Sequence, residues 1–150
     1  MEQIMEWKEH LLDNPLYFGI FFIFGWILVS FTFAIFTGWY KLAEQYRTYE
    51  KPGVKLLQAV HVTWGSSLMA GNIYTLGSTY KGLYLGVLFP FRIGHPPLLI
   101  PWRDISAKKV KRLVVSKIQL EFKNVLSRPF EISENVAEKL KAGSNGQLSF

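Results

Sequence analysis

The chain has 150 residues, enough for one ordinary domain and a membrane segment. It has no cysteine, which excludes disulfides and thiolate metal sites. The net charge of +6 is unevenly divided, because residues 15–40 carry no charged side chain. One lysine and four acids precede that stretch, giving −3, while sixteen cations and seven acids follow it, giving +9. The composition predicts an uncharged segment between an acidic tail and a basic domain.

The tail, residues 1–14, predicts a short helix lying on a membrane surface. Ile4, Trp7, Leu11 and Leu12 fall on one helical face, as in interfacial amphipathic helices. A disordered tail is the alternative.

Residues 15–40 predict a transmembrane helix. Over Leu16–Tyr40 such a helix would be about 37 Å long, and a bilayer's hydrocarbon core is about 30 Å thick. Tyr17 at one end, and Trp39 and Tyr40 at the other, match the aromatic belts of spanning helices. A cleaved signal peptide would have a basic first region and a small-residue cleavage site. A buried helix of a soluble core, the other alternative, would need more surrounding protein than this chain provides.

The charges on the two sides of this helix predict its orientation. Lys8 stands alone before it, whereas Lys41, Arg47, Lys51 and Lys55 follow closely. Because cations favour the cytoplasmic side, we expect the N-terminus outside and the domain in the cytoplasm. We expect a single-pass protein of the bacterial inner membrane.

Within the helix, Ser30, Ala34 and Gly38 form a strip of small residues at four-residue spacing. Such strips let a second helix approach closely, so this one predicts a homodimer or a membrane-protein partner. Chance spacing is the alternative.

Residues 41–54 predict a helical continuation or a stalk that is broken at Pro52-Gly53. The pattern then changes to alternation and predicts a mainly β domain over 55–143. About six or seven antiparallel strands are expected, the clearest at 55–64, 72–78, 82–89, 98–102, 114–123 and 128–132. Ser133 is a natural N-cap for a final helix that ends at Gly143, and residues 144–150 are expected to be loose.

Three segments carry a resemblance to a known family. TLGSTYKGLYL (75–85) is similar to its hairpin, LLIPWRDISAKKV (98–110) to a strand and the following turn, and ISENVAEKL (132–140) to its closing helix. Together they resemble the pleckstrin-homology (PH) superfold, including GRAM and bacterial PH-like domains. The resemblance implies a partly open strand barrel capped by the C-terminal helix. It implies no particular ligand, because function resides in sites.

Catalytic patterns are absent from the sequence. His10, His61 and His95 do not stand at metal-ligand spacing, and no phosphate loop or hydrolase motif occurs. Asp104 is expected to bond backbone N–H groups in a turn. We expect no enzyme, no metal and no cofactor.

The basic residues are the main candidates for binding. Four lie within five positions, in what the sequence predicts to be a loop: Lys108, Lys109, Lys111 and Arg112. Since a cation near an anionic leaflet gains about 1 kcal/mol, this cluster predicts contact with lipid headgroups or an acidic partner. A solvated turn is the alternative. No aromatic-basic motif suggests nucleic acid.

The proline-rich segment Phe89–Arg103 offers a second candidate set, Arg92, His95 and Arg103. Its prolines order the backbone, which lowers the entropic cost of binding. A purely structural corner is the alternative.

These features predict a non-enzymatic single-pass protein whose cytoplasmic PH-like domain binds protein or anionic lipid at the membrane surface. Tethering by the helix would raise the domain's effective concentration there. The alternative is a small accessory or assembly subunit of a larger membrane complex, joined through Ser30, Ala34 and Gly38.

Overall fold

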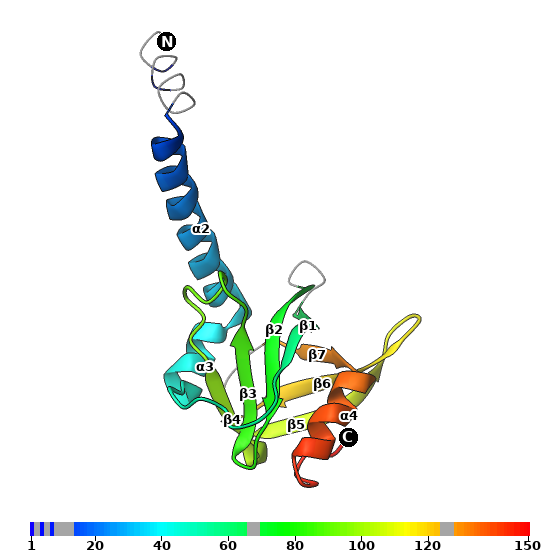
Figure 1. Ribbon diagram of the computed structural model, residues 1–150. Helices are drawn as coiled ribbons and strands as arrows, with labels where there is room; N and C mark the ends of the chain where they lie inside the picture. The colour runs from blue at the N-terminus through cyan, green and yellow to red at the C-terminus, as the bar shows by residue number, and fades with distance from the viewer. Residues whose placement is uncertain (2–3, 5–6, 8–13, 66–69, 124–127) are drawn as a thin grey trace.

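The computed structural model describes residues 1, 4, 7, 14–65, 70–123 and 128–150. It has a long apolar helix, a curled seven-stranded antiparallel sheet and a C-terminal helix (Figure 1). This layout confirms the predicted fold class. The tail helix predicted before Asn14 lies outside the described residues, apart from the exposed Ile4 and Trp7.

The apolar helix α2 runs over Pro15–Thr37. The Asn14 side chain accepts a hydrogen bond from the Leu16 N–H at 3.1 Å, and Pro15 occupies the first turn, where its missing N–H costs nothing. Gly38 ends the helix with a φ of 82°, a left-handed conformation that suits glycine. By length and composition α2 is apolar enough to cross a membrane.

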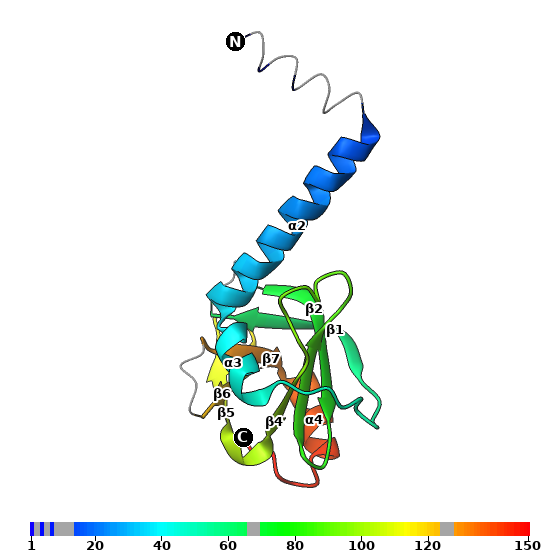
Figure 2. The same cartoon turned by 90° about the vertical axis from the view of Figure 1, so that its left-hand side faces the viewer.

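Helix α3, Trp39–Tyr46, follows directly and belongs to the domain (Figure 2). Trp39 and Leu42 are fully buried, and Ala43 and Tyr46 are nearly so. Residues 41–46, expected to form a stalk, are thus packed against the sheet. Trp39, expected in an interfacial belt, is instead a core residue, whereas its neighbour Tyr40 is exposed.

The seven strands form one sheet in the order β4-β3-β2-β1-β7-β6-β5, with every neighbouring pair antiparallel. Their bounds are Leu57–Trp64 (β1), Ala70–Ser78 (β2), Gly82–Val87 (β3), Leu98–Pro101 (β4), Ile105–Lys111 (β5), Ser116–Phe122 (β6) and Phe130–Ser133 (β7). A 3₁₀ turn, η2 (Trp102–Asp104), joins β4 to β5. The sheet curls around a single core.

Strand β5 corrects the sequence analysis, which placed a loop there. It pairs with β6 along its whole length, from Ile105 opposite Phe122 to Lys111 opposite Ser116. As an edge strand it is half solvated, and lysines commonly occupy such edges because they discourage pairing with other chains. Its three lysines therefore concealed the alternation.

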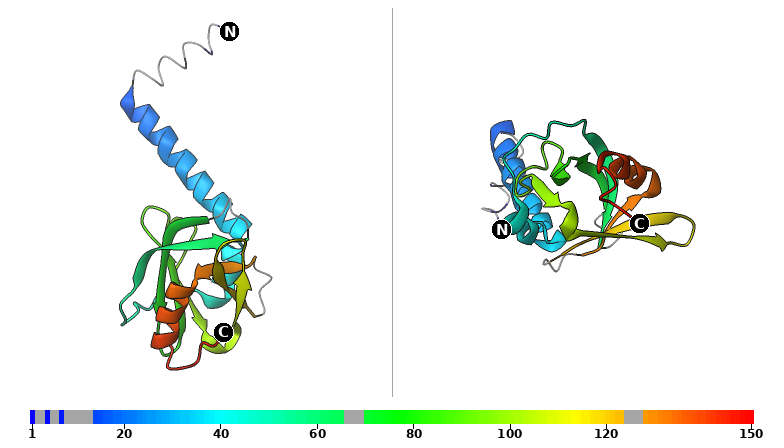
Figure 3. Two further views of the ribbon diagram at one scale, coloured as in Figure 1. Left: turned by 90° about the vertical axis from the view of Figure 1, so that its right-hand side faces the viewer. Right: turned by 90° about the horizontal axis from the view of Figure 1, so that it is seen from below.

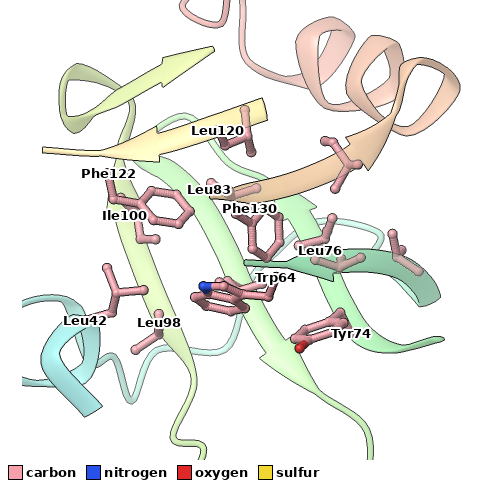
Figure 4. Packing of buried hydrophobic residues seen from close by; sticks show 14 of the residues in the cluster. Leu42, Trp64, Tyr74, Leu76, Leu83, Leu98, Ile100, Leu120, Phe122 and Phe130 are labelled. Carbon is pink, nitrogen blue, oxygen red and sulfur yellow. The ribbon is translucent and has the colours of Figure 1, made fainter. Parts of the chain in front are cut away.

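Aromatic side chains fill the centre of the core (Figure 4). The Trp64 ring lies 4.9 Å from that of Phe130 and 6.0 Å from that of Tyr74, measured between centroids. Burial raises the pKa of Tyr74 to about 12. Leu42 of α3 faces Leu98 of β4 in this cluster (Figure 4).

Helix α4, Glu134–Gly143, packs against β2, β6 and β7. The Ser133 hydroxyl caps it by accepting from the Val136 N–H, as predicted. The Ser78 hydroxyl donates to the Leu140 carbonyl at 2.7 Å, which ties the helix to β2. In contrast to the expected loose end, Ser144 and Leu148 are buried.

Candidate functional site

The loop between β3 and β4, residues 88–97, packs along the lower half of α2 (Figure 1). The Trp26 indole donates to the Pro90 carbonyl at 3.4 Å, and its ring lies 5.0 Å from that of Phe91. Further down, Gly94 lies so close to Phe31 that a β-carbon would come within 3.3 Å of its ring. The loop and the helix therefore form one packed junction.

The small-residue strip of α2 is used inside the chain. Ser30 and Ala34 are only 5% and 2% exposed, because they face the domain where α2 meets it. Gly38 instead forms the sharp turn between α2 and α3. The predicted helix-packing face is therefore already covered, and its three residues do not present a surface to a second helix.

His95 lies within this junction and is buried, which differs from the exposed ligand expected from sequence. Its ring packs edge-on against Trp39 at 5.1 Å, and the Trp39 indole donates to the Pro96 carbonyl at 2.9 Å. Burial lowers the pKa of His95 below its usual value. The prolines thus form a corner that locks α3 onto the domain.

The two arginines of the predicted proline-loop site, Arg92 and Arg103, are not brought together. Arg92 is exposed and donates from Nε to the Val87 carbonyl at 3.1 Å. Arg103 lies in η2, at the opposite end of β4 from the loop. Arg92 and His95 line one small pocket of about 120 Å³, but Arg103 lies apart from it, so the three do not form a common site.

An apolar cleft of about 310 Å³ separates α2 from β2 beside this loop. Its walls include Trp26, Val29, Phe33, Ile73, Tyr74 and Phe91. Ser30, Thr37 and His95 also line it, but most of the lining surface is apolar, so the cleft is suited to an apolar group.

The predicted basic cluster lies on the β5–β6 hairpin, and most of its cations form ion pairs there. Lys108 pairs with Glu121, Lys109 with Glu134 at 2.6 Å, and Arg112 with Glu131. Lys108 holds the pKa of Glu121 below its usual value, and Glu131 raises that of Arg112. Among the described residues, only Lys111 of the four forms no ion pair.

The turn of this hairpin carries three exposed apolar side chains that the sequence analysis missed: Leu113, Val114 and Val115. The Arg112 N–H closes the turn on the Val115 carbonyl at 3.0 Å. Seen from below, the hairpin projects from the side of the domain opposite α2 and α3 (Figure 3). The signal in the sequence is an apolar run, residues 113–115, that stands between cations and does not alternate with polar residues; part of it falls within the strand predicted over 114–123.

The described ranges contain no group of three or more acidic or histidine side chains that could hold a metal ion. His61 Nδ1 lies 2.7 Å from the Asn72 side-chain oxygen, on the outer face of the sheet. Asp104 accepts a hydrogen bond from the Tyr46 hydroxyl at 3.2 Å, rather than from the turn backbone expected. These contacts join α3 to η2 and β1 to β2.

No family model, no curated protein and no solved structure matches this chain.

Proposed function

We propose that this chain is a non-enzymatic, single-pass membrane protein whose PH-like domain docks a partner protein through the β5–β6 hairpin. One observation carries the proposal: Leu113 and Val114 are fully or almost fully exposed at the tip of a projecting hairpin. Exposed apolar side chains grouped in this way, with polar residues around them, are typical of interaction sites.

The membrane assignment draws on α2 and on the flanking charges. Apolar side chains surround the helix on the sides that do not face the domain, including Phe21, Phe24, Leu28 and Ile35. Because cations follow the helix, the domain is assigned to the cytoplasmic side.

The PH-like assignment draws on topology. Seven antiparallel strands followed by one helix that covers an end of the curled sheet fit that superfold. The fold by itself favours no ligand.

Burial of α3 changes the mechanism expected from sequence. With Trp39 and Leu42 in the core, the domain is attached directly to α2 and is not separated from it by a stalk over residues 41–54. A fixed mount holds the hairpin in one orientation to the membrane, which lowers the entropic cost of docking.

A protein partner is favoured over anionic lipid because the cluster's charge is partly neutralised. Three of its four cations are paired with Glu121, Glu131 or Glu134. The pairs with Glu121 and Glu134 are exposed and therefore weak, so they do not prevent a headgroup contact, but all three pairs leave a smaller net charge to attract one.

The accessory-subunit alternative has less support than the sequence suggested. It depended on the small-residue strip, and Ser30 and Ala34 face the chain's own domain.

A photo-crosslinking amino acid at position 113 of the full chain, activated in native membranes, tests this proposal. We expect a discrete protein adduct that is absent when the crosslinker replaces Tyr80, an exposed residue in the β2–β3 turn. Adducts with lipid alone would favour headgroup binding, and no position-dependent adduct would refute the docking site.

A further inference from the structure

We propose that the β3–β4 loop is inserted among the acyl chains of the inner leaflet, as a second membrane contact beside α2. This inference rests on the proposed membrane span of α2. It concerns a different segment from the hairpin proposed above.

The depth of the loop follows from its contacts with α2. Its Pro90 and Phe91 lie against Trp26, the twelfth of the 23 residues of the helix. A hydrocarbon core takes about 20 helical residues, so a core beginning at Pro15 extends to about Ala34. Trp26 precedes Ala34 by eight residues, or about 12 Å along the axis.

A tilted helix would still place Trp26 inside the hydrocarbon boundary. A tilt of about 40°, at the upper end of the usual range, would still leave Trp26 about 9 Å inside the hydrocarbon boundary. Since each leaflet contributes about 15 Å, the loop tip would reach well into the inner one.

The side chains of the loop suit lipid. Phe89 is 82% exposed and Ile93 37% exposed in the chain alone, so both are available to acyl chains. The loop has one cation, Arg92, which donates to the Val87 carbonyl at the end of β3. Its side chain therefore points away from the loop tip, in the direction in which it could reach the headgroups.

The loop backbone meets only in part a requirement of the bilayer, where unpaired polar groups are costly. The N–H groups of Phe89, Arg92, Ile93 and Gly94 form no hydrogen bond with a described residue and would have to reach water or headgroup oxygens, whereas the others are bonded. The Phe91 N–H bonds to the Leu88 carbonyl at 2.8 Å and the His95 N–H to the Arg92 carbonyl at 2.9 Å. The Trp26 indole bonds the Pro90 carbonyl, and three prolines in the loop have no N–H to satisfy.

The absence of cysteine makes a direct test available. Single variants Phe89→Cys and Ile93→Cys of the full chain would be labelled with the fluorophore NBD and reconstituted into phosphatidylcholine vesicles. The vesicles would carry nitroxides either on the acyl chain or on the headgroup. Phe21→Cys, on the exposed side of α2, and Tyr80→Cys, in the β2–β3 turn, would serve as inside and outside controls.

We expect the label at position 89 or 93 to be quenched more strongly by acyl-chain than by headgroup nitroxides, as at position 21. The label at position 80 should be quenched by neither. Quenching at position 21 but at neither loop position would overturn the inserted loop while leaving the span intact. If position 21 is also unquenched, the span itself is wrong and the inference falls with it.

Discussion

The indole ring of Trp39 in α3 lies against that of Trp64 in β1, with the ring centroids 5.6 Å apart. Both side chains are fully buried. The contact joins the segment that leaves α2 to the first strand of the sheet, so the direction of α2 is set by the core of the domain.

Replacing Trp39 by alanine should therefore destabilise the domain, even though Trp39 adjoins the proposed membrane segment. Truncating a buried tryptophan leaves a large cavity, and we expect the free energy of unfolding to fall by about 3–5 kcal/mol. Urea titration of the full chain in detergent micelles would measure this change.

The neighbouring variant Tyr40→Ala is the matched control, because Tyr40 is exposed on the same helix. Its effect should stay within about 0.5 kcal/mol. Equal effects of the two variants would contradict the packing of α3 in the core.

Gly82 is required where β3 meets β4. A β-carbon at this position would lie 2.1 Å from the Ile100 carbonyl oxygen, which is backbone and cannot move aside without breaking the strand pairing. We expect Gly82→Ala to destabilise the domain by about 3 kcal/mol or more, as severe overpacking does. Gly53→Ala, where a β-carbon meets no atom within 4 Å, should leave the urea midpoint nearly unchanged.

Local signals made parts of this fold predictable. Ser133 and Gly143 marked both ends of the last helix, and alternation along residues 118–122 identified β6. The place of Trp39 was not predictable, because an aromatic residue beside a cation fits a membrane interface as well as a core. The contact of the β3–β4 loop with Trp26 was also not predictable, since it joins residues 64 positions apart.

The candidate sites were less predictable than the fold. The cations of the basic cluster were recognisable, but their partners were not. Glu121 is reached through the register of the β5–β6 hairpin, and Glu131 of β7 and Glu134 of α4 only through the tertiary fold. Similarly, nothing local in Ser30 and Ala34 indicated that the neighbour of the strip would be the chain's own domain rather than another helix.

Buried His95 should make the domain's stability depend on pH. Its pKa in the folded chain lies below the ordinary value of 6.5, so as the pH falls through that value the unfolded chain binds a proton that the folded chain does not. The free energy of unfolding should begin to fall as the pH drops toward 6.5, and it should go on falling until the pH passes the lower pKa of folded His95, by at most about 1.4 kcal/mol per pH unit.

The variant His95→Gln should flatten this pH dependence, whatever its effect on overall stability. His61→Gln, the same change at an exposed histidine, should leave the slope in place. A slope unchanged by His95→Gln would show that another group is responsible.

The cations of the basic cluster should differ in how much they contribute to the stability of the domain. Arg112 pairs with Glu131, whose side chain is only 6% exposed, so Arg112→Gln leaves a buried carboxylate without its counterion. We expect this variant to lower the urea midpoint, and Lys111→Gln, with no ion pair to lose among the described residues, to leave it unchanged. Equal midpoints for both variants would show that the Arg112–Glu131 pair contributes nothing to stability.

The central claim is that α2 crosses the membrane and leaves the domain on the cytoplasmic side. Labelling single cysteines with a membrane-impermeant maleimide tests it most directly, using Trp7→Cys before the helix and Tyr80→Cys in the domain. The experiment would use intact cells, or spheroplasts where an outer membrane must first be removed. We predict that position 7 is labelled in these cells, and that position 80 is labelled only after the membrane is permeabilised. Labelling of both positions from the same side would contradict the claim.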